Sequence, residues 1–184
     1  MPREPMMVAQ AAEVIARAYG LSSPPAVAAQ ARHLLQMGAL VPAARRGQGR
    51  LAAALLDDGD LCRFVLLTRL SGMGAVPETL RDGAACMHNI VVPAEASAPG
   101  VTASETGWPA LIASMRRGDE WLFVFHLQQI GPAGGRFVRL TTDTPAEELI
   151  APLPMRGNNA GTYLLAASDI LRPLLNALAE LPDD

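Results

Sequence analysis

The side chains best suited to chemistry lie in the first third of the chain, and they are hydrogen-bonding or cationic rather than nucleophilic. The segment RRGQGR at 45–50 places three guanidinium groups beside two glycines. A guanidinium binds a phosphate or a base edge through two parallel hydrogen bonds, and glycine lets the backbone approach a ligand closely. Residues 22–36 add hydroxyl, amide and imidazole groups. The candidate binding residues are Ser22, Ser23, Gln30, Arg32, His33, Gln36, Arg45, Arg46, Gln48 and Arg50.

Charge is unevenly spread along these 184 residues, although the formal net charge is only −3. Residues 1–70 carry a net charge of +3 and residues 71–184 carry −6, and no acidic residue lies between Glu13 and Asp57. Binding of an anion follows the local field more than the total charge, so this stretch is suited to an anionic partner. An ordinary solvated surface explains the same counts.

All 15 basic residues are arginine and none is lysine. A genome rich in G and C explains this choice together with the frequent alanine, glycine and proline. Selection for bidentate contacts to phosphates or bases is the alternative explanation.

Other reactive residues are too sparse for catalysis or for a metal site. Cys86 and His88 have no closed zinc-site spacing by themselves, and a buried structural cysteine explains Cys86 better. The acidic DDGD at 57–60 lacks the register of a calcium loop and suits helix capping instead. GPAGGR at 131–136 joins two expected strands, so it is no phosphate loop. We therefore expect no enzyme activity, no cofactor and no metal.

Two helices are expected to position the candidate residues between Ser22 and Gln36. The alanine-rich residues 8–19 predict a helix with one apolar face, which Gly20 ends. Ser23 is a suitable N-cap and Pro24 a suitable first residue for the next helix, which runs to about Met37. The two helices are separated only by a tight turn.

A hairpin and a third helix are expected to follow. Leu40–Val41 and Leu51–Leu56 predict two short strands, and RRGQGR forms the tip between them. The leucine-rich residues 61–70 predict a helix whose start is stabilised by the preceding aspartates.

The order of these elements resembles that of the winged helix-turn-helix DNA-binding family. VIARAYGLSSPPAVAAQARHLLQMGAL at 14–40 has the supporting helix, the YGLS turn and the longer second helix, and RRGQGRL at 45–51 stands where the wing would be. The helix at 60–70 is similar to the one after the wing in MerR-like members, although the tyrosine of their Arg-x-Tyr-x-x-x-Asp-Leu segment is absent. The resemblance covers about a third of the chain.

This resemblance implies how the candidate residues would act. The second helix would enter the major groove, which is wide enough to admit it, and offer its outward side chains to base edges or phosphates. The arginine tip would contact phosphates or reach into a minor groove. Pro24 and Pro25 are a departure, because they remove backbone donors that often bind phosphate.

The C-terminal half predicts a second, smaller α+β domain. PAEASAPGVTASETG at 93–107 has the composition of a linker or of an ordered loop between two halves of one domain. Beyond it we expect a helix at 108–117, a hairpin of strands 120–130 and 136–142, a strand at 163–167 and a helix at 170–181. The whole order of elements is also similar to that of small proteins encoded in prophages.

Composition limits the class of protein to which the chain can belong. Half of the residues are hydrophobic, which suffices for a packed core, and no apolar run is long enough to span a bilayer. The sequence starts without the apolar stretch of a signal peptide, so we expect a cytoplasmic location.

The expected fold class is α+β, with a winged helix-turn-helix domain at 5–90, a linker at 91–106 and a small domain at 107–184 that suits dimerisation. The expected function is sequence-dependent binding of double-stranded DNA, as a transcriptional regulator or a prophage-related accessory factor. The alternative is a protein-interaction or assembly module that uses a winged-helix fold without binding DNA. We expect a homodimer as a further partner and no membrane.

Overall fold

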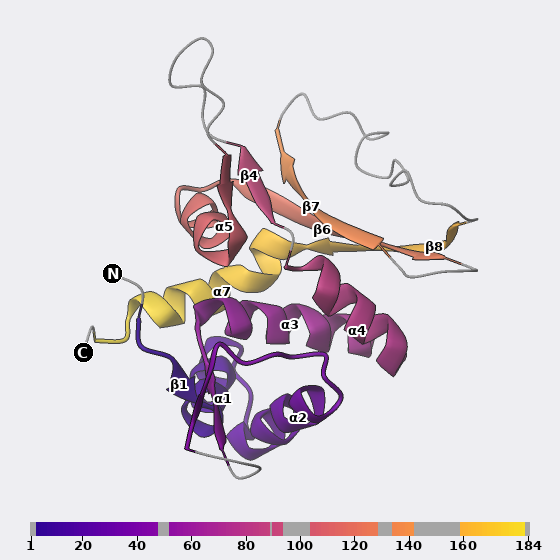
Figure 1. The fold of residues 1–184 in the computed structure, drawn as a ribbon. Coiled ribbons are helices and arrows are strands. Elements are labelled where there is room, and N and C mark those ends of the chain that lie inside the picture. Colours follow the sequence, from indigo (N-terminus) through magenta and orange to yellow (C-terminus); the bar gives the residue numbers. More distant parts are fainter. Residues whose placement is uncertain are drawn as a thin grey trace. The chain divides into compact units, whose positions relative to one another are not determined.

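The computed structural model describes residues 3–47, 52–88, 90–93, 104–128, 134–141 and 159–182. Its helices and strands, shown along the chain in Figure 1, include two antiparallel three-stranded sheets and confirm the predicted α+β class. The chain forms two compact units. The first comprises Met1–Arg81 with Asp169–Asp184, and the second comprises Asp82–Ser168.

The first unit is mainly helical. Its helices near the predicted binding residues are α1 (Val8–Ala18), α2 (Pro24–Gln36) and α3 (Asp58–Gly72). Helix α4 (Pro77–Cys86) begins in this unit, and α7 (Ala167–Ala179) contributes all but its first two residues. Two predicted helices are thus confirmed at 8–18 and 24–36.

The first two helices are joined by a tight turn with defined chemistry. Gly20 has φ of 63°, a left-handed conformation that glycine adopts without strain. Ser23 caps α2, because its hydroxyl oxygen accepts a hydrogen bond from the Ala26 N–H at 3.4 Å. Burial of Ile15 on α1 and Leu34 on α2 anchors the pair in the core of the unit.

The small sheet of the first unit contains the predicted hairpin. Its strands, in the order β1-β3-β2, are β1 (Met6–Met7), β2 (Ala44–Arg46) and β3 (Ala53–Leu56). Arg45 pairs with Ala54 and Arg46 with Ala53, so the hairpin is confirmed with both arginines on its first strand.

The first strand of this hairpin starts later than predicted, and the expectation of a strand at Leu40–Val41 is wrong. Pro42 has no N–H to give to a ladder, and the neighbouring backbone groups bond to α3 instead. The Val41 carbonyl accepts from Arg63 at 3.5 Å, and the Ala43 N–H donates to Asp60 at 2.7 Å. Residues 40–43 therefore connect α2 to β2 without sheet pairing.

Asp60 joins the hairpin to the start of α3. Its carboxylate accepts hydrogen bonds from the N–H groups of Ala43 and Asp57 and lies 3.3 Å from the Arg63 guanidinium. Asp57 in turn accepts from the Asp60 N–H at 2.7 Å, which completes a reciprocal capping box. Asp60 and Arg63 are both buried. Helix α3 thus begins at Asp58, three residues before the predicted start, because these caps satisfy its first turn.

The described residues of the second unit include five strands and one complete helix. The strands β4 (Val91–Pro93) and β5 (Ser104–Thr106) pair with each other and precede α5 (Gly107–Arg116). A three-stranded sheet follows in the order β7-β6-β8, with strands β6 (Glu120–Gln128), β7 (Gly134–Leu140) and β8 (Asn159–Ala166). The ends of the predicted linker are therefore sheet, and β8 begins four residues before the strand predicted at 163–167.

Aromatic side chains form the core of this sheet. Phe123 contacts Phe137 with ring centroids 4.9 Å apart, and Phe125 stacks on Tyr163 at 6.3 Å. Gly135 pairs with Phe125, and a Cβ atom at this glycine would lie 3.0 Å from the rings of Phe123 and Phe125. Two aromatic rings therefore fill the space that a side chain would need.

A polar network fixes the start of β6. The Ser114 hydroxyl donates to Asp119 at 2.5 Å and accepts from the Trp121 indole at 3.0 Å. Arg139 forms a salt bridge with Asp119. Burial alone would raise the pKa of Asp119, but the bonds from Ser114 and Arg139 outweigh it and lower this pKa.

The two compact units do not coincide with the predicted ranges 5–90 and 107–184. Residues Asp169–Asp184 belong to the first unit, where the Tyr19 hydroxyl donates to the Ile170 carbonyl at 2.5 Å. Arg3 likewise donates to the Leu178 carbonyl at 2.8 Å. Within the described ranges, no helix is long and apolar enough to cross a membrane.

We predict that Gly135→Ala destabilises the second unit by about 1–3 kcal/mol, because the added methyl group must displace two buried phenyl rings. Urea unfolding followed by the fluorescence of Trp108 and Trp121 measures this loss. Gly161→Ala is the matched control in the same sheet, since among the described residues its Cβ would meet only Leu127, at an ordinary 4.0 Å. Equal unfolding midpoints for the two variants would contradict the packing argument.

We also predict that Asp60 titrates with a pKa of about 6, because burial and the nearby Asp57 outweigh the bonds from Ala43, Arg63 and Asp57 N–H. A raised pKa means that the stability contributed by protonated Asp60 is full below about 4 and is lost as pH rises through 6.

The carboxyl ¹³C shift of Asp60, followed by NMR against pH, measures this pKa directly. The unfolding free energy of the wild type relative to Asp60→Asn should fall between about pH 4 and about pH 6.5. The lower limit is the pKa of Asp60 in the unfolded chain, and the upper limit lies just above its pKa in the folded protein. A carboxyl midpoint below that of an ordinary aspartate would contradict the prediction.

Candidate nucleic-acid interface

Helix α2 presents one continuous exposed stripe to solvent. The exposed residues follow each other at spacings of three and four, which places them on one face of a helix. They are Pro25, Ala26, Ala29, Arg32, His33 and Gln36. The N-terminal half of this stripe is small and apolar, and the C-terminal half carries every hydrogen-bonding side chain.

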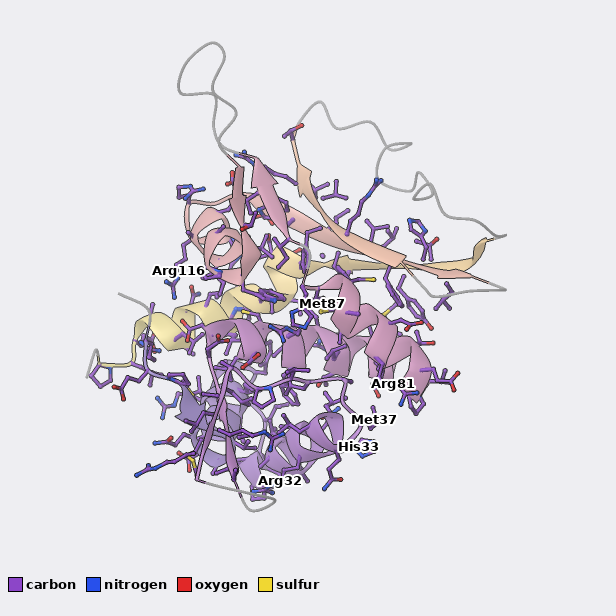
Figure 2. All side chains as sticks on the ribbon, in the orientation of Figure 1. Arg32, His33, Met37, Arg81, Met87 and Arg116 are labelled. Atoms are coloured by element: carbon purple, nitrogen blue, oxygen red, sulfur yellow. The ribbon has the colours of Figure 1, made fainter. Side chains whose placement is uncertain are left out.

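Figure 2 shows Arg32 and His33 on the side of α2 that faces away from α3. This orientation follows from the packing of the opposite side, where Val27, Ala31 and Leu34 are buried. The apolar positions of α2 thus force its cationic and amide side chains outward.

A groove of about 460 Å³ lies between this stripe and the hairpin. Arg32 and Gln36 line it from α2, and Arg45 lines it from β2. The rest of its wall is formed by Leu35 of α2, by Ala52 with the first two residues of β3, and by Met7–Ala9. The structure therefore brings together three of the predicted binding residues that lie up to 13 positions apart in the sequence.

The groove is electropositive at short range. None of its lining residues is acidic, and Arg32, Arg45 and Arg46 form no salt bridge with any carboxylate in the described part of the chain. Asp60, although near in sequence, directs its carboxylate to Ala43, Asp57 and Arg63. The guanidinium groups of the groove are thus available to an external anion.

The N-terminus of α2 offers no free backbone donors in its first four positions. Pro24 and Pro25 have no N–H, and the Ala26 N–H bonds to both the Ser23 hydroxyl and the Ser23 carbonyl. The Val27 N–H also donates to the Ser23 carbonyl, at 3.3 Å. An anion at this end of α2 would have to be bound by side chains, because the usual helix-end donors are occupied or missing.

The other predicted residues are distributed differently. Ser22 and Ser23 are exposed at the turn before α2, and His33 and Arg46 are exposed next to the groove without lining it. Gln30 lies on another side of α2, where it lines a separate cleft with Tyr19 and Arg69. Gln48 and Arg50 lie outside the described residues.

Small residues of the groove wall had no signal in the sequence. Ala52–Ala54 bear no functional group, and the two-residue strand Met6–Met7 is too short to give a pattern. Ala52–Ala54 follow the RRGQGR segment after one intervening residue, and their side chains are small. Their size leaves the groove open between the two cationic walls.

The chain finds no match among protein-family models, curated proteins or solved structures. The likeness to winged helix-turn-helix domains therefore depends on the residues and element order of 8–70 themselves. What these residues provide is a helix with an exposed stripe, a hairpin with two described arginines and a groove that unites them.

Proposed function

We propose that this chain binds double-stranded DNA in a sequence-dependent manner, with α2 in the major groove and the β2–β3 hairpin on the backbone. The observation that carries the proposal is the groove in which Arg32 and Gln36 face Arg45. These are two guanidinium groups and one amide, without a competing carboxylate among the lining residues. Guanidinium and amide side chains are the groups that read guanine and adenine edges.

The exposed stripe of α2 supports close approach to bases. A B-DNA major groove is about 12 Å wide and admits one helix. Ala26 and Ala29 are small enough to let the N-terminal half of α2 sit deep, where their methyl groups can meet thymine methyls. Arg32 and Gln36 then supply the polar contacts one and two turns further along the helix.

The hairpin supports contact with phosphates. Arg45 and Arg46 are adjacent on β2, and both side chains are exposed. Because neighbouring side chains on a strand point to opposite faces, the two guanidinium groups would reach different phosphates. This role is needed all the more because the N-terminus of α2 lacks free N–H donors.

The proposed biological role is that of a transcriptional regulator or a prophage-related accessory factor, which implies a cytoplasmic location. It rests on the resemblance of 8–70 to winged helix-turn-helix domains. A homodimer would follow from a palindromic target with half-sites about one helical turn apart.

The decisive experiment is selection from a pool of random duplex DNA by gel shift at two salt concentrations. An enriched sequence supports the proposal, and its symmetry reports whether one or two copies bind. Weak binding without enrichment would reduce the function to non-specific association. No binding at low salt would overturn the proposal and favour a protein-interaction module.

We predict that Arg45→Ala/Arg46→Ala weakens binding of every duplex by at least tenfold at moderate salt, and lowers the slope of log K against log salt by about 2. The reason is that each lost phosphate contact releases about one counterion fewer. Arg116→Ala/Arg117→Ala is the matched control, since both residues are exposed, adjacent and in the second unit (Arg116 is labelled in Figure 2). An unchanged slope in the first variant would remove the hairpin from the interface.

We predict a different signature for Arg32→Ala. Loss of a bidentate base contact should cost about 1–3 kcal/mol on the selected sequence and relax the preference at one base pair. Repeating the selection with the variant measures both effects. Arg17→Ala, on an exposed position of α1, removes the same charge and should leave the selected sequence unchanged. A uniform loss at all positions would instead make Arg32 a phosphate contact.

A further inference from the structure

The first unit contains a second cleft, which the proposed function does not use. It has a volume of about 150 Å³ and lies among α1, α2 and α3. Its apolar wall includes Ile15, Val27, Phe64 and Val65, of which all four are buried. A cavity of this size with aliphatic and phenyl walls is large enough for one six-membered ring.

Three polar groups line the same cleft. Thr68 contributes a buried hydroxyl that has no hydrogen-bond partner in the described ranges. Gln30 contributes a half-buried amide from α2. Arg69 is exposed and forms no salt bridge with any described carboxylate. A buried hydroxyl without a partner carries an unfavourable free energy, which a ligand that accepts its hydrogen bond would remove.

Tyr19 lies beside Arg69 in the cleft and is uncharged. Its hydroxyl donates to the Ile170 carbonyl at 2.5 Å, and its ring centroid lies 6.0 Å from the Arg69 guanidinium carbon. Burial raises the pKa of Tyr19 far above that of a free phenol, with Cys62 adding to the shift and Arg69 opposing it. The phenol therefore stays neutral, and Arg69 is the charged group at this site.

We propose that this cleft binds a small monocyclic carboxylate, with its ring between α1 and α3 and its carboxylate toward Arg69. The apolar wall and the volume select a single ring, and the guanidinium selects the anion over a neutral analogue. The Thr68 hydroxyl and the Gln30 amide are the further donors at the site. This proposal does not rest on the proposed DNA binding, because the cleft and the groove have no lining residue in common.

Sodium benzoate and benzyl alcohol are the probes, because they share a ring and differ in charge. Titration of the ¹⁵N-labelled full chain should give saturable amide shifts that cluster at Val27, Gln30, Val65 and Thr68. Benzoate should bind about tenfold more tightly than benzyl alcohol, because its carboxylate gains one charge-assisted interaction with Arg69. Scattered or non-saturating shifts, or equal affinity for the two probes, would overturn the proposal.

Two substitutions separate the charge from the cavity. Arg69→Gln should abolish the preference for benzoate while weak binding of benzyl alcohol persists, and Gln30→Phe should block both probes by filling the cleft. Arg17→Gln is the matched control for net charge, because Arg17 is exposed on α1 and does not line the cleft. Circular dichroism checks that each variant is folded. A loss in Arg17→Gln equal to that in Arg69→Gln would overturn the assignment, since it would reduce the preference to long-range attraction.

Discussion

The position of the hairpin relative to α3 in the first unit depends on the hydrogen bonds that the Asp60 carboxylate accepts. Strands of three and four residues cannot hold a hairpin in place by their own pairing, so its position must come from outside the sheet. Asp60 fixes the position of the hairpin by accepting a hydrogen bond from the N–H of Ala43, one residue before β2. The same carboxylate accepts the N–H of Asp57, the residue that caps α3. Arg63 adds a second link through the Val41 carbonyl. Through these bonds, α3 determines where Arg45 lies relative to α2.

Helix α2 contributes to two separate surfaces, through Arg32, Leu35 and Gln36 at one and through Val27 and Gln30 at the other. Its exposed stripe forms one wall of the cationic groove, and Val27 and Gln30 form part of the apolar cleft. The lining of the groove combines two guanidinium groups and an amide with alanine and aliphatic side chains, whereas the lining of the cleft is mainly aliphatic and aromatic, with Gln30, Thr68 and Arg69 as its polar and charged members. Under the two proposals, the groove would bind a polyanion and the cleft would bind a single-ring anion.

The elements of the first unit could largely be predicted from the sequence, because local signals determine them. Apolar spacing, Gly20, Ser23 and the paired prolines mark α1 and α2 to within about a residue. What could not be predicted depends on contacts between distant residues. Leu40–Val41 has the pattern of a strand, but the Val41 carbonyl bonds to a side chain of α3. Met6–Met7 forms a strand only because Leu55 and Leu56 pair with it.

The same division holds for the candidate site and for the C-terminal part. Arg32, Gln36 and Arg45 are candidate binding residues by their types alone, but the groove that they line together, with its alanine wall, could not be predicted. Helix α7 accepts hydrogen bonds from Tyr19 and Arg3 of the first unit, and these long-range contacts have no sequence signal. The tight packing around Gly135 likewise comes from cross-strand rings, which periodicity does not reveal.

The paired prolines at the start of α2 also act on the unfolded chain. Each fixes one φ angle before folding, and a proline at a compatible position raises stability by about 0.4–1 kcal/mol through the smaller entropy lost on folding. The direction in which α2 leaves the turn is thus set before any partner arrives. An interface built on such a helix is preorganised on one side, so it would bind with little ordering cost there, and any fitting to the curvature of a partner would fall to the hairpin or to the partner itself.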